Sequence, residues 1–443
     1  MRAPSAIERH NGPASLARLH PNMHKLWLIL FVGSILTACG GAGGRSSPDQ
    51  LTIAINSGVE GDGLKTAKAD YEREFSISIT IAEFPYTNLF EKEFIDLKEG
   101  TGAYDIIMLD DPWFPRFAEE DLLAEFEPLY QKRGLSGPDD DFVTASLALC
   151  YHPYGDGKLY ALPYVGNSQM FFYREDLFHK HNLPPPETWD DVLSSARLLQ
   201  EKEGIFGYVM RGAQGNPIVA DYMPLFWAFG GEMFDSQGNP QVNSPEGVEA
   251  LRFMIELGKY SPPGYVSFNA DEVGAHLSQG TAAMGINWPA WISTFDDPTK
   301  SKVVGKIGYL PIPSQKARGA SSIGNWLLAI PKSARNQEKA FDFILWATSK
   351  EQMKLSALRG NPPTRVSVFK DPELLARFKA YPVQLVALES SKPRPRTPLW
   401  NEIENVFGIY LSQANSKQLS PEEALGRAND EIKRIIERNR RAP

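Results

Sequence analysis

The alternation of short apolar runs with amphipathic stretches over residues 51–110 constrains the fold of this chain more than any other feature. Residues 51–56 (LTIAIN), 77–84 (ISITIAEF) and 104–109 (YDIIML) are typical of β-strands, and the last run is apolar as in a strand buried on both faces. Between them, residues 63–75 and 88–100 place apolar side chains on one helical face. This strand–helix order predicts a parallel sheet in an α/β fold.

The loops that follow these three strands are the first candidate ligand contacts, because ligands gather at the carboxyl ends of parallel strands. They are residues 56–63 (NSGVEGDG), 84–88 (FPYTN) and 110–113 (DDPW). The candidates in them are Glu60, Tyr86, Asp110, Asp111 and Trp113. We expect one of the two aspartates to cap the next helix and the other to face the ligand, and the sequence leaves open which does which.

A second unit begins near residues 160–178 (YALPYVGNSQMFFYREDLF). Strands are predicted within residues 204–212 (GIFGYVMRG) and 281–288 (TAAMGINW). Helices are predicted after four capping residues, Thr188, Ser244, Asn269 and Ser420. The length of the chain favours two domains.

The start of the chain has the pattern of an export signal. Residues 26–38 are apolar and follow Lys25, and the run is shorter than the roughly 20 residues that span a bilayer. It ends in LTAC, which is similar to the lipobox of bacterial lipoproteins. That resemblance implies acylation of Cys39, a signal peptide over residues 1–38 and a flexible tether over 39–50. An ordinary signal peptide with an incidental cysteine is the alternative, and the sequence allows either Met1 or Met23 as the start.

Charge and motifs restrict the class of protein. The formal charge is −8, made of +3 in residues 1–38 and −11 in the remainder, which disfavours nucleic acid as a partner. The sequence contains no P-loop, HExxH, GxSxG or Cys/His metal pattern, so we expect neither a cofactor nor an enzyme. Without Cys39, Cys150 is the single cysteine and no intrachain disulfide can form.

Five stretches occur in the order found in the extracellular solute-binding proteins of bacterial ABC importers, a family that includes maltose-, trehalose- and polyol-binding members. They are residues 104–129, 157–178 (GKLYALPYVGNSQMFFYREDLF), 184–199 (PPPETWDDVLSSARLL), 282–291 (AAMGINWPAW) and 324–349 (GNWLLAIPKSARNQEKAFDFILWATS). The resemblance implies a two-lobed α/β fold with a ligand cleft between the lobes. Hinge crossings are expected near 163–168, 305–313 and 348–353. The first lobe would comprise 51–163 and 311–348, and the second 164–310 and 349–443.

The same resemblance implies a function. The chain is expected to be a monomeric, exported lipoprotein, anchored on the periplasmic or outer side of a membrane, that captures a mono- or disaccharide or a polyol and delivers it to an ABC permease. Two alternatives remain. The ligand could be an anionic sugar such as a sugar phosphate, or the chain could be a secreted glycoside-active enzyme with paired carboxylates such as Asp110 and Glu232.

Further candidate contacts follow from the resemblance, since aromatic faces match the C–H patches of a sugar and polar side chains match its hydroxyls. They are Asn167, Trp288, Trp291, Asn325, Trp326 and Arg365. The resemblance also supports Glu60, because its loop contacts the sugar in members of the family. For Trp288 and Trp291 the alternative is a place in the core. Asn167 stands where the maltose-binding members carry an acid, which argues against a maltodextrin ligand. Arg394 and Arg396 are expected in an ordered crossing loop rather than in contact with the ligand.

Overall fold

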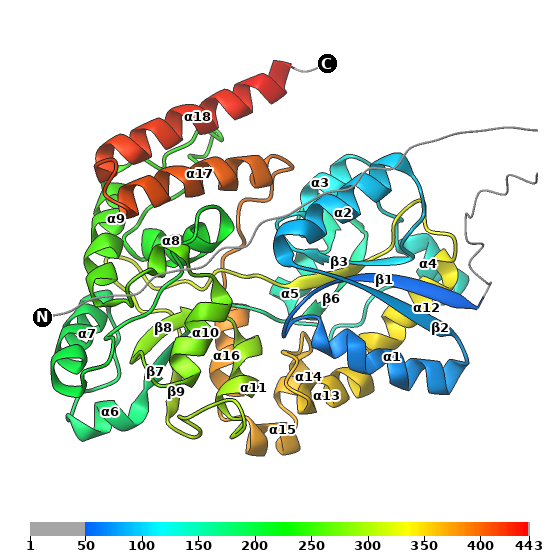
Figure 1. The fold of residues 1–443 in the computed structure, drawn as a ribbon. Coiled ribbons are helices and arrows are strands. Elements are labelled where there is room, and N and C mark those ends of the chain that lie inside the picture. Colours follow the sequence, from blue (N-terminus) through cyan, green and yellow to red (C-terminus); the bar gives the residue numbers. More distant parts are fainter. Residues whose placement is uncertain (1–48, 442–443) are drawn as a thin grey trace, which may run out of the picture. The chain divides into compact units, whose positions relative to one another are not determined.

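The computed structural model describes residues 49–441 (Figure 1). The predicted signal peptide, lipidation at Cys39 and nearly all of the predicted tether lie outside the described residues. Within residues 49–441, no helix is both long and apolar enough to cross a membrane.

The first lobe is built on a five-stranded sheet in the order β2-β1-β3-β10-β6. Its strands are β1 (Gln50–Asn56), β2 (Ser78–Phe84), β3 (Ile106–Asp110), β6 (Ala161–Val165) and β10 (Trp326–Ala329). The strands β2, β1 and β3 are parallel, as predicted, and β10 is antiparallel to both β3 and β6. A short hairpin of β4 (Tyr151–His152) and β5 (Lys158–Leu159) lies apart from this sheet.

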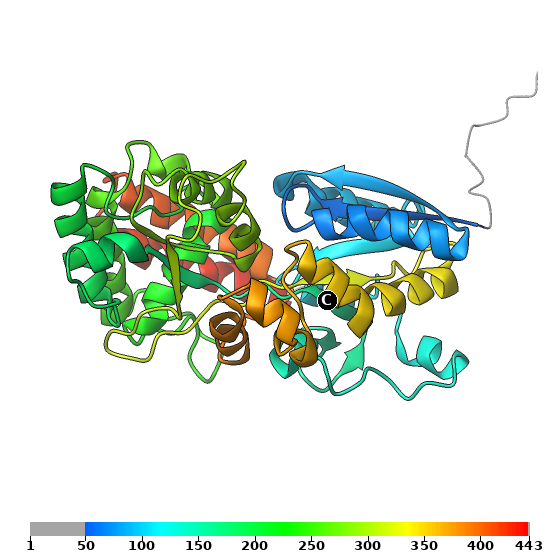
Figure 2. The ribbon, with the colours of Figure 1, turned by 90° about the horizontal axis from the view of Figure 1, so that it is seen from below.

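Helices flank this sheet because their apolar stripes need a partner surface. The helix α1 (Asp62–Phe75) buries Leu64, Ala67 and Tyr71, and α2 (Tyr86–Glu99) ends at Gly100 in a left-handed conformation. The remaining helices of this lobe are α3 (Phe114–Glu119), α4 (Glu127–Lys132), α5 (Thr144–Ala148), α12 (Gln337–Ala347), α13 (Lys350–Leu358), α14 (Val366–Phe369) and α15 (Pro372–Arg377). The helices α1 and α13 lie side by side (Figures 1 and 2).

The second lobe contains a three-stranded antiparallel sheet in the order β8-β7-β9. Its strands are β7 (Met170–Arg174), β8 (Met284–Asn287) and β9 (Ile307–Leu310). Its helices are α6 (Glu175–Lys180), α7 (Trp189–Glu203), α8 (Asn216–Ala228), α9 (Pro245–Leu257), α10 (Ala270–Ser278), α11 (Ile292–Phe295), α17 (Trp400–Asn415) and α18 (Pro421–Arg441), with short 3-10 turns η1 (Gly258–Tyr260), η2 (Tyr265–Ser267) and η3 (Pro289–Trp291). The helix α16 (Tyr381–Glu389) contacts both lobes, because Tyr381 and Leu388 lie in the first core and Ala387 packs in an apolar cluster with β7. The helices α17 and α18 run side by side (Figure 1).

The strand predicted within residues 204–212 does not form. This segment meets β8 only at isolated bridges, such as Val209 with Gly285. A regular ladder is interrupted because two of its backbone N–H groups donate elsewhere. The N–H of Tyr208 donates to the carbonyl of Tyr260, and the N–H of Arg211 donates to the carboxylate of Asp221.

The four predicted helix caps are confirmed. Thr188 and Asp191 form a capping box at α7, and Ser244 accepts a hydrogen bond from the N–H of Gly247 at α9. Asn269 caps α10, and the pair of Ser420 and Glu423 exchanges hydrogen bonds ahead of α18. The local signals were therefore sufficient for these helix starts.

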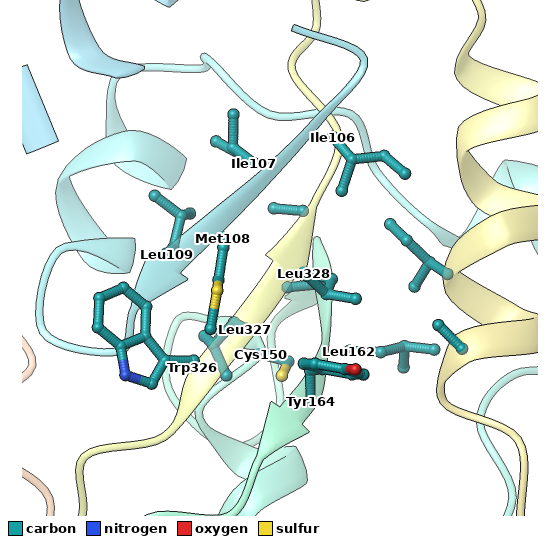
Figure 3. Packing of buried hydrophobic residues seen from close by; sticks show 14 of the residues in the cluster. Ile106, Ile107, Met108, Leu109, Cys150, Leu162, Tyr164, Trp326, Leu327 and Leu328 are labelled. Carbon is teal, nitrogen blue, oxygen red and sulfur yellow. The ribbon is translucent and has the colours of Figure 1, made fainter. Parts of the chain in front are cut away.

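Each lobe has its own apolar core. In the first, Met108 on β3, Leu328 on β10 and Leu162 on β6 are among the packed side chains (Figure 3). Cys150 lies in the same core, where burial raises the pKa of its thiol well above the usual range. The second core contains side chains from β7, α7–α9 and α17–α18.

The first crossing between the lobes lies where it was expected, and the second and third crossings lie further along the chain than expected. That first crossing lies between β6 and β7, within the expected region. The second follows β9 and reaches the first core at Ile323. Residues 349–378, expected in the second lobe, contribute Met353, Val368 and Phe378 to the first core because α13 and α14 present apolar faces to it. The return to the second core is complete at Trp400.

Candidate ligand-binding site

A cavity of about 300 Å³ lies between the two lobes. Its lining from the first lobe is Asn56, Ser57, Glu60, Pro85, Tyr86, Thr87 and Asp110. Its lining from the second lobe is Arg211, Asn216, Asn269, Ala270, Asp271 and Trp288. The strand β10 of the first lobe contributes Trp326, and the crossing segments contribute Asn167, Gly324 and Arg394. We refer to this cavity as the interlobe pocket.

The parallel strands explain the first-lobe half of the interlobe pocket. Strands β1 and β3 end at Asn56 and Asp110, and β2 ends at Phe84, two residues before Tyr86. Because the carboxyl ends of parallel strands share one edge of the sheet, these side chains meet there. The expectation that the loops after the strands supply the site agrees with this geometry.

Asp110 is the aspartate that lines the interlobe pocket. It accepts a hydrogen bond from the hydroxyl of Tyr86 at 2.8 Å and one from Nη2 of Arg394 at 2.9 Å. Arg394 is buried, and the carboxylates of Asp110 and Asp111 hold its pKa well above the usual range. The expectation that Arg394 only orders a crossing loop is therefore incomplete, because its side chain also lines the pocket.

Asp111 does not line the interlobe pocket and lies in a buried ion-pair cluster. Its carboxylate lies 3.1 Å from Nη2 of Arg394 and 3.2 Å from Nη1 of Arg396. Burial raises its pKa to about 6, opposed by the Arg394 charge. Neither aspartate caps the next helix, because α3 begins after Trp113 without a side-chain cap. The capping expectation is wrong, since the arginines take up the carboxylate oxygens.

Arg211 and Trp288 form the second-lobe wall. The guanidinium carbon of Arg211 lies 5.2 Å from the centroid of the Trp288 ring. Nε of Arg211 donates to the carboxylate of Asp221 at 2.6 Å. The edge of the indole is close to Gly324, where an added Cβ would lie 2.6 Å from Cη2. Trp288 is half-buried and held between a cation and the crossing segment.

Three aromatic side chains form a cluster at the first-lobe wall. The ring centroids of Tyr86 and Trp113 are 5.0 Å apart, and those of Trp113 and Trp326 are 5.8 Å apart. Tyr86 and Trp326 line the interlobe pocket, whereas Trp113 is buried behind them. Figure 3 shows Trp326 on β10 next to the sheet core. Trp113 thus supports the wall and does not form part of it.

Two carboxyl groups near the interlobe pocket have pKa values near neutrality. Burial raises the pKa of Glu60 to about 7, and the charges of Asp271 and Asp110 add to the rise. Burial also raises the pKa of Glu404 to about 7, opposed by Arg394. Glu404 accepts a hydrogen bond from the amide of Asn216 at 2.9 Å. Both groups therefore titrate close to neutral pH.

Four buried side-chain atoms of pocket residues have no hydrogen-bond partner among residues 49–441. They are Oδ1 of Asn56, Oδ1 of Asn167, Nη2 of Arg211 and Nε of Arg394. Buried polar atoms without a partner are costly, and a polar ligand can satisfy them. Donors and acceptors occur together in this set, which suits a hydroxyl group, because a hydroxyl both donates and accepts.

Besides Asp111 and Trp113, three more predicted site residues lie outside the lining of the interlobe pocket. Trp291 packs against Gly274 of α10, and Asn325 is buried next to the pocket with both amide atoms unpartnered. Arg365 instead pairs with Asp139 at 2.6 Å and donates to the carbonyl of Thr348 at 2.6 Å. The structure does not bring Arg365 to the interlobe pocket, because these partners and the ring of Phe142 hold the guanidinium in the first lobe.

Sequence reasoning missed several lining residues. Arg211 lies in the segment 204–212, which gave a strand signal without pointing to a site, and Asn216 follows that segment. Thr87 lies in the candidate loop 84–88 but was not singled out. Asn269 and Asp271 were noticed only for the start of α10. The predicted helix start at Asn269 could have pointed to a site, because the first turn of a helix has backbone N–H groups without partners in the helix.

A larger and more open groove of about 940 Å³ lies beside the interlobe pocket. Its lining includes Asp62, Asp297, Arg359 and Lys379, with Phe378 as its one aromatic ring. Ligand pockets combine apolar faces with a few convergent polar groups. The groove has one aromatic ring in its lining, whereas the interlobe pocket has three, from Tyr86, Trp288 and Trp326. We therefore place the candidate site in the interlobe pocket. Among residues 49–441, no cluster of three or more His, Cys, Asp or Glu side chains could hold a metal ion.

Comparison with known proteins identifies the family. The profile of the bacterial extracellular solute-binding proteins matches residues 56–354. A probable amino-acid ABC transporter periplasmic-binding protein of Sinorhizobium fredii is 26% identical over 426 residues, which cover 92% of this chain and 95% of that protein. A mannitol-binding protein of Pseudomonas aeruginosa is 32% identical over 310 residues, which cover 64% of this chain and 70% of that protein.

A solved structure gives the same answer for the fold. The ABC transporter solute-binding protein of Agrobacterium radiobacter K84, in complex with ribitol, superposes with a TM-score of 0.82 at 27% identity, covering 87% of this chain and 98% of that chain. The expected two-lobed α/β fold is confirmed. The family transports solutes and is not a family of enzymes. This chain belongs to the family of bacterial extracellular solute-binding proteins.

Proposed function

We propose that the chain captures a small neutral polyhydroxylated compound, a linear polyol or a monosaccharide, and delivers it to the permease of an ABC importer. The observation that carries the proposal is the set of buried, unpartnered donor and acceptor atoms around the interlobe pocket. Two of the similar proteins, by name or bound compound, are associated with mannitol and ribitol, which present only hydroxyl groups.

The size of the interlobe pocket favours a single sugar or polyol. Its volume of about 300 Å³ is at the low end of the roughly 300–1,000 Å³ typical of ligand pockets. The half-buried indole of Trp288 supplies an apolar face for the C–H groups of such a ligand. The acceptors Asn56 and Asn167 and the donor Arg211 would bond its hydroxyls.

The position of the interlobe pocket supports a hinge mechanism. Glu60, Tyr86 and Asp110 come from the first lobe, whereas Arg211 and Trp288 come from the second. A ligand held by both sets stabilises the closed arrangement over an open one, because it contacts both lobes only when they are together. The permease would then receive the closed, loaded protein. We expect it to act as a monomer.

Anchoring is the second part of the proposal. The LTAC sequence supports lipidation of Cys39, which would hold the protein on the periplasmic or outer side of a membrane near its permease. Mass spectrometry of the mature protein tests this. Acyl chains on an N-terminal Cys39 are expected, and Cys39→Ser should lack both the acyl chains and the cut before residue 39. An unmodified mature terminus in the wild type would refute lipidation.

An amino acid is the second candidate ligand, because the relative of Sinorhizobium fredii is named as a probable amino-acid binder. Glu60 and Asp271, which form no ion pair among the described residues, could receive an ammonium group. The carboxylate of an amino acid would need an unpaired cation, and both pocket arginines already have acidic partners. We therefore rank a neutral polyol first.

A thermal-shift screen tests the proposal. Ligand binding raises the melting temperature by mass action, so a rise reveals a ligand of any chemical class. The screen compares alditols, monosaccharides, disaccharides, sugar phosphates and amino acids, each against wild type and Trp288→Ala. A shift with an alditol or monosaccharide that is lost in Trp288→Ala supports the proposal. Shifts confined to sugar phosphates or amino acids would overturn it.

A further inference from the structure

Both arginines that line the interlobe pocket have their own buried counter-ions. Arg211 pairs with Asp221 in the second lobe, and Arg394 pairs with Asp110 and Asp111 at the first. All five side chains are almost completely buried. The two lobes therefore contribute the same arrangement independently: an arginine that faces the pocket and an aspartate that neutralises it.

The pair in the second lobe is tightly constrained. Nε of Arg211 donates to Oδ1 of Asp221 at 2.6 Å, and the backbone N–H of Arg211 donates to Oδ2 at 2.8 Å. Burial raises the pKa of Asp221, and the guanidinium and these hydrogen bonds counteract the rise. Arg211 is 1% exposed and Asp221 is 3% exposed. Asp221 lies on α8 behind Arg211 and does not line the pocket.

One donor of Arg211 remains available to the ligand. Its Nη2 is buried and has no hydrogen-bond partner in the part of the chain that the structure describes, while its guanidinium lies over the ring of Trp288. In the first lobe, Arg394 likewise keeps Nε without a partner. Arg396 adds a second cation to Asp111, so two arginines and two aspartates balance there.

An unpaired buried arginine is a receptor for carboxylate or phosphate, which it binds through charge and paired donors. An arginine already neutralised by an aspartate keeps its N–H groups but offers no net charge. A hydroxyl oxygen can accept from such a donor without desolvating a charge of its own. An anion in the same place would also meet Asp110, Glu60 and Asp271 in the lining.

We propose that Asp221 is a specificity-determining residue that sets the interlobe pocket for uncharged polyols and against their anionic forms, by neutralising Arg211 from behind. Asp221 acts through Arg211 and does not contact the ligand, so it is a positioning residue as well. Asp111 has the corresponding role for Arg394. This inference rests on the proposed function, because it concerns selectivity among polyhydroxylated ligands.

The test compares two ligands with one carbon skeleton, D-mannitol and D-mannonate, with ribitol and ribonate as a second pair. They differ at one end, where a hydroxymethyl group is replaced by a carboxylate. Affinities are measured by calorimetry at pH 7.5 for wild type, Asp221→Asn and Asp111→Asn. Asp342→Asn is the matched control, because it removes an aspartate paired with Arg133 on the surface of the first lobe.

Wild type is expected to bind the alditol of one pair at least about tenfold more tightly than the aldonate, a difference of about 1.4 kcal/mol. Asp221→Asn should shift this ratio by at least about tenfold toward the aldonate, since Arg211 then presents an uncompensated charge. A purely structural role would weaken both ligands equally and leave the ratio unchanged. Asp342→Asn should retain the wild-type ratio.

The outcomes separate the inference from the proposed function. If wild type binds an alditol but the ratio is unchanged in Asp221→Asn, the inference is overturned and the proposed function stands. If Asp221→Asn does not fold, the same ratio measured for Asp111→Asn decides the inference. Asp111 pairs with Arg394, which lines the interlobe pocket. If wild type binds no alditol or sugar at all, the proposed function is overturned and the inference with it.

Discussion

Replacing Trp288 with alanine tests the second-lobe wall of the interlobe pocket. The indole lines the pocket, lies under the guanidinium of Arg211 at 5.2 Å and packs against Gly324. We expect the substitution to remove the apolar face on which a polyol rests. It also removes the aromatic support of Arg211, a cation–π contact of about 0.5–2 kcal/mol.

The two effects predict a large loss of affinity and a smaller loss of stability. Truncating a central aromatic contact typically costs about 2 kcal/mol or more, roughly a 30-fold rise in Kd. Truncating a fully buried tryptophan would cost about 3–5 kcal/mol of folding free energy. Trp288 is only half-buried, so its cost in stability should be about 1–3 kcal/mol, below that range.

Trp291 is the matched control, since it is the same residue type three positions on. It is half-buried, packs against Gly274 of α10 and does not line the pocket. Trp291→Ala should therefore lower stability by a similar amount and leave the affinity within about threefold of wild type. Calorimetric titration and urea unfolding are measured on both variants. The reasoning would be refuted if Trp288→Ala bound the ligand as tightly as wild type, or if Trp288→Ala and Trp291→Ala lost the same affinity.

Individual contacts elsewhere in the molecule give three further predictions. Arg365→Ala should lower the free energy of unfolding by about 1.5–3 kcal/mol because the buried guanidinium loses its contacts to Asp139 and to the carbonyl of Thr348. Urea unfolding and ligand titration check this, and a loss of affinity without a loss of stability would contradict it. Gly324→Ala should raise Kd at least about tenfold because the added Cβ meets Trp288 at 2.6 Å, and an unchanged Kd in calorimetry would count against that contact. Burial raises the pKa of Glu404 above its unfolded value to about 7, so its contribution to stability is present at low pH and disappears as pH rises through 7. Between about pH 5 and pH 8, Glu404 should lower the free energy of unfolding by up to about 3 kcal/mol, and Glu404→Gln should remove this contribution. The same pH dependence of the free energy of unfolding in wild type and variant would exclude Glu404 as a cause.

The local pattern of the sequence was sufficient for the first half of the first lobe. The strands β1, β2 and β3 and the helices between them follow from apolar spacing alone, and the parallel order follows from the alternation. Because parallel strands end at one edge, Glu60, Tyr86 and Asp110 could be placed near each other without a structure. These predictions depend on contacts within a short stretch of chain.

The arginines show where local reasoning failed. Arg365 and Arg394 both lie in proline-containing loops, and the sequence favoured Arg365 for the site. In the structure Arg394 lines the interlobe pocket, while Arg365 is held by Asp139. Which loop reaches the pocket is decided by where the chain crosses between lobes. That depends on contacts between residues hundreds of positions apart, such as Asp110 with Arg394.

The neighbouring aspartates illustrate a similar limit. Asp110 ends β3 and Asp111 follows it, and both carboxylates reach Nη2 of Arg394. The sequence shows the pair but not which of the two lines the interlobe pocket. Arg396 and Arg394 settle the orientation of Asp111 from the far end of the chain. Arg211 was missed because its segment has the pattern of a strand, whereas Asp221 takes its backbone N–H.

The most direct test of the account is a crystal structure of the protein with an alditol or monosaccharide identified by the thermal-shift screen. The account predicts one bound molecule in the interlobe pocket, with its C–H groups against Trp288 and its hydroxyls bonded to Asn167 and Arg211. Ligand density in the open groove beside Asp62 and Lys379, with the interlobe pocket occupied only by water, would contradict it.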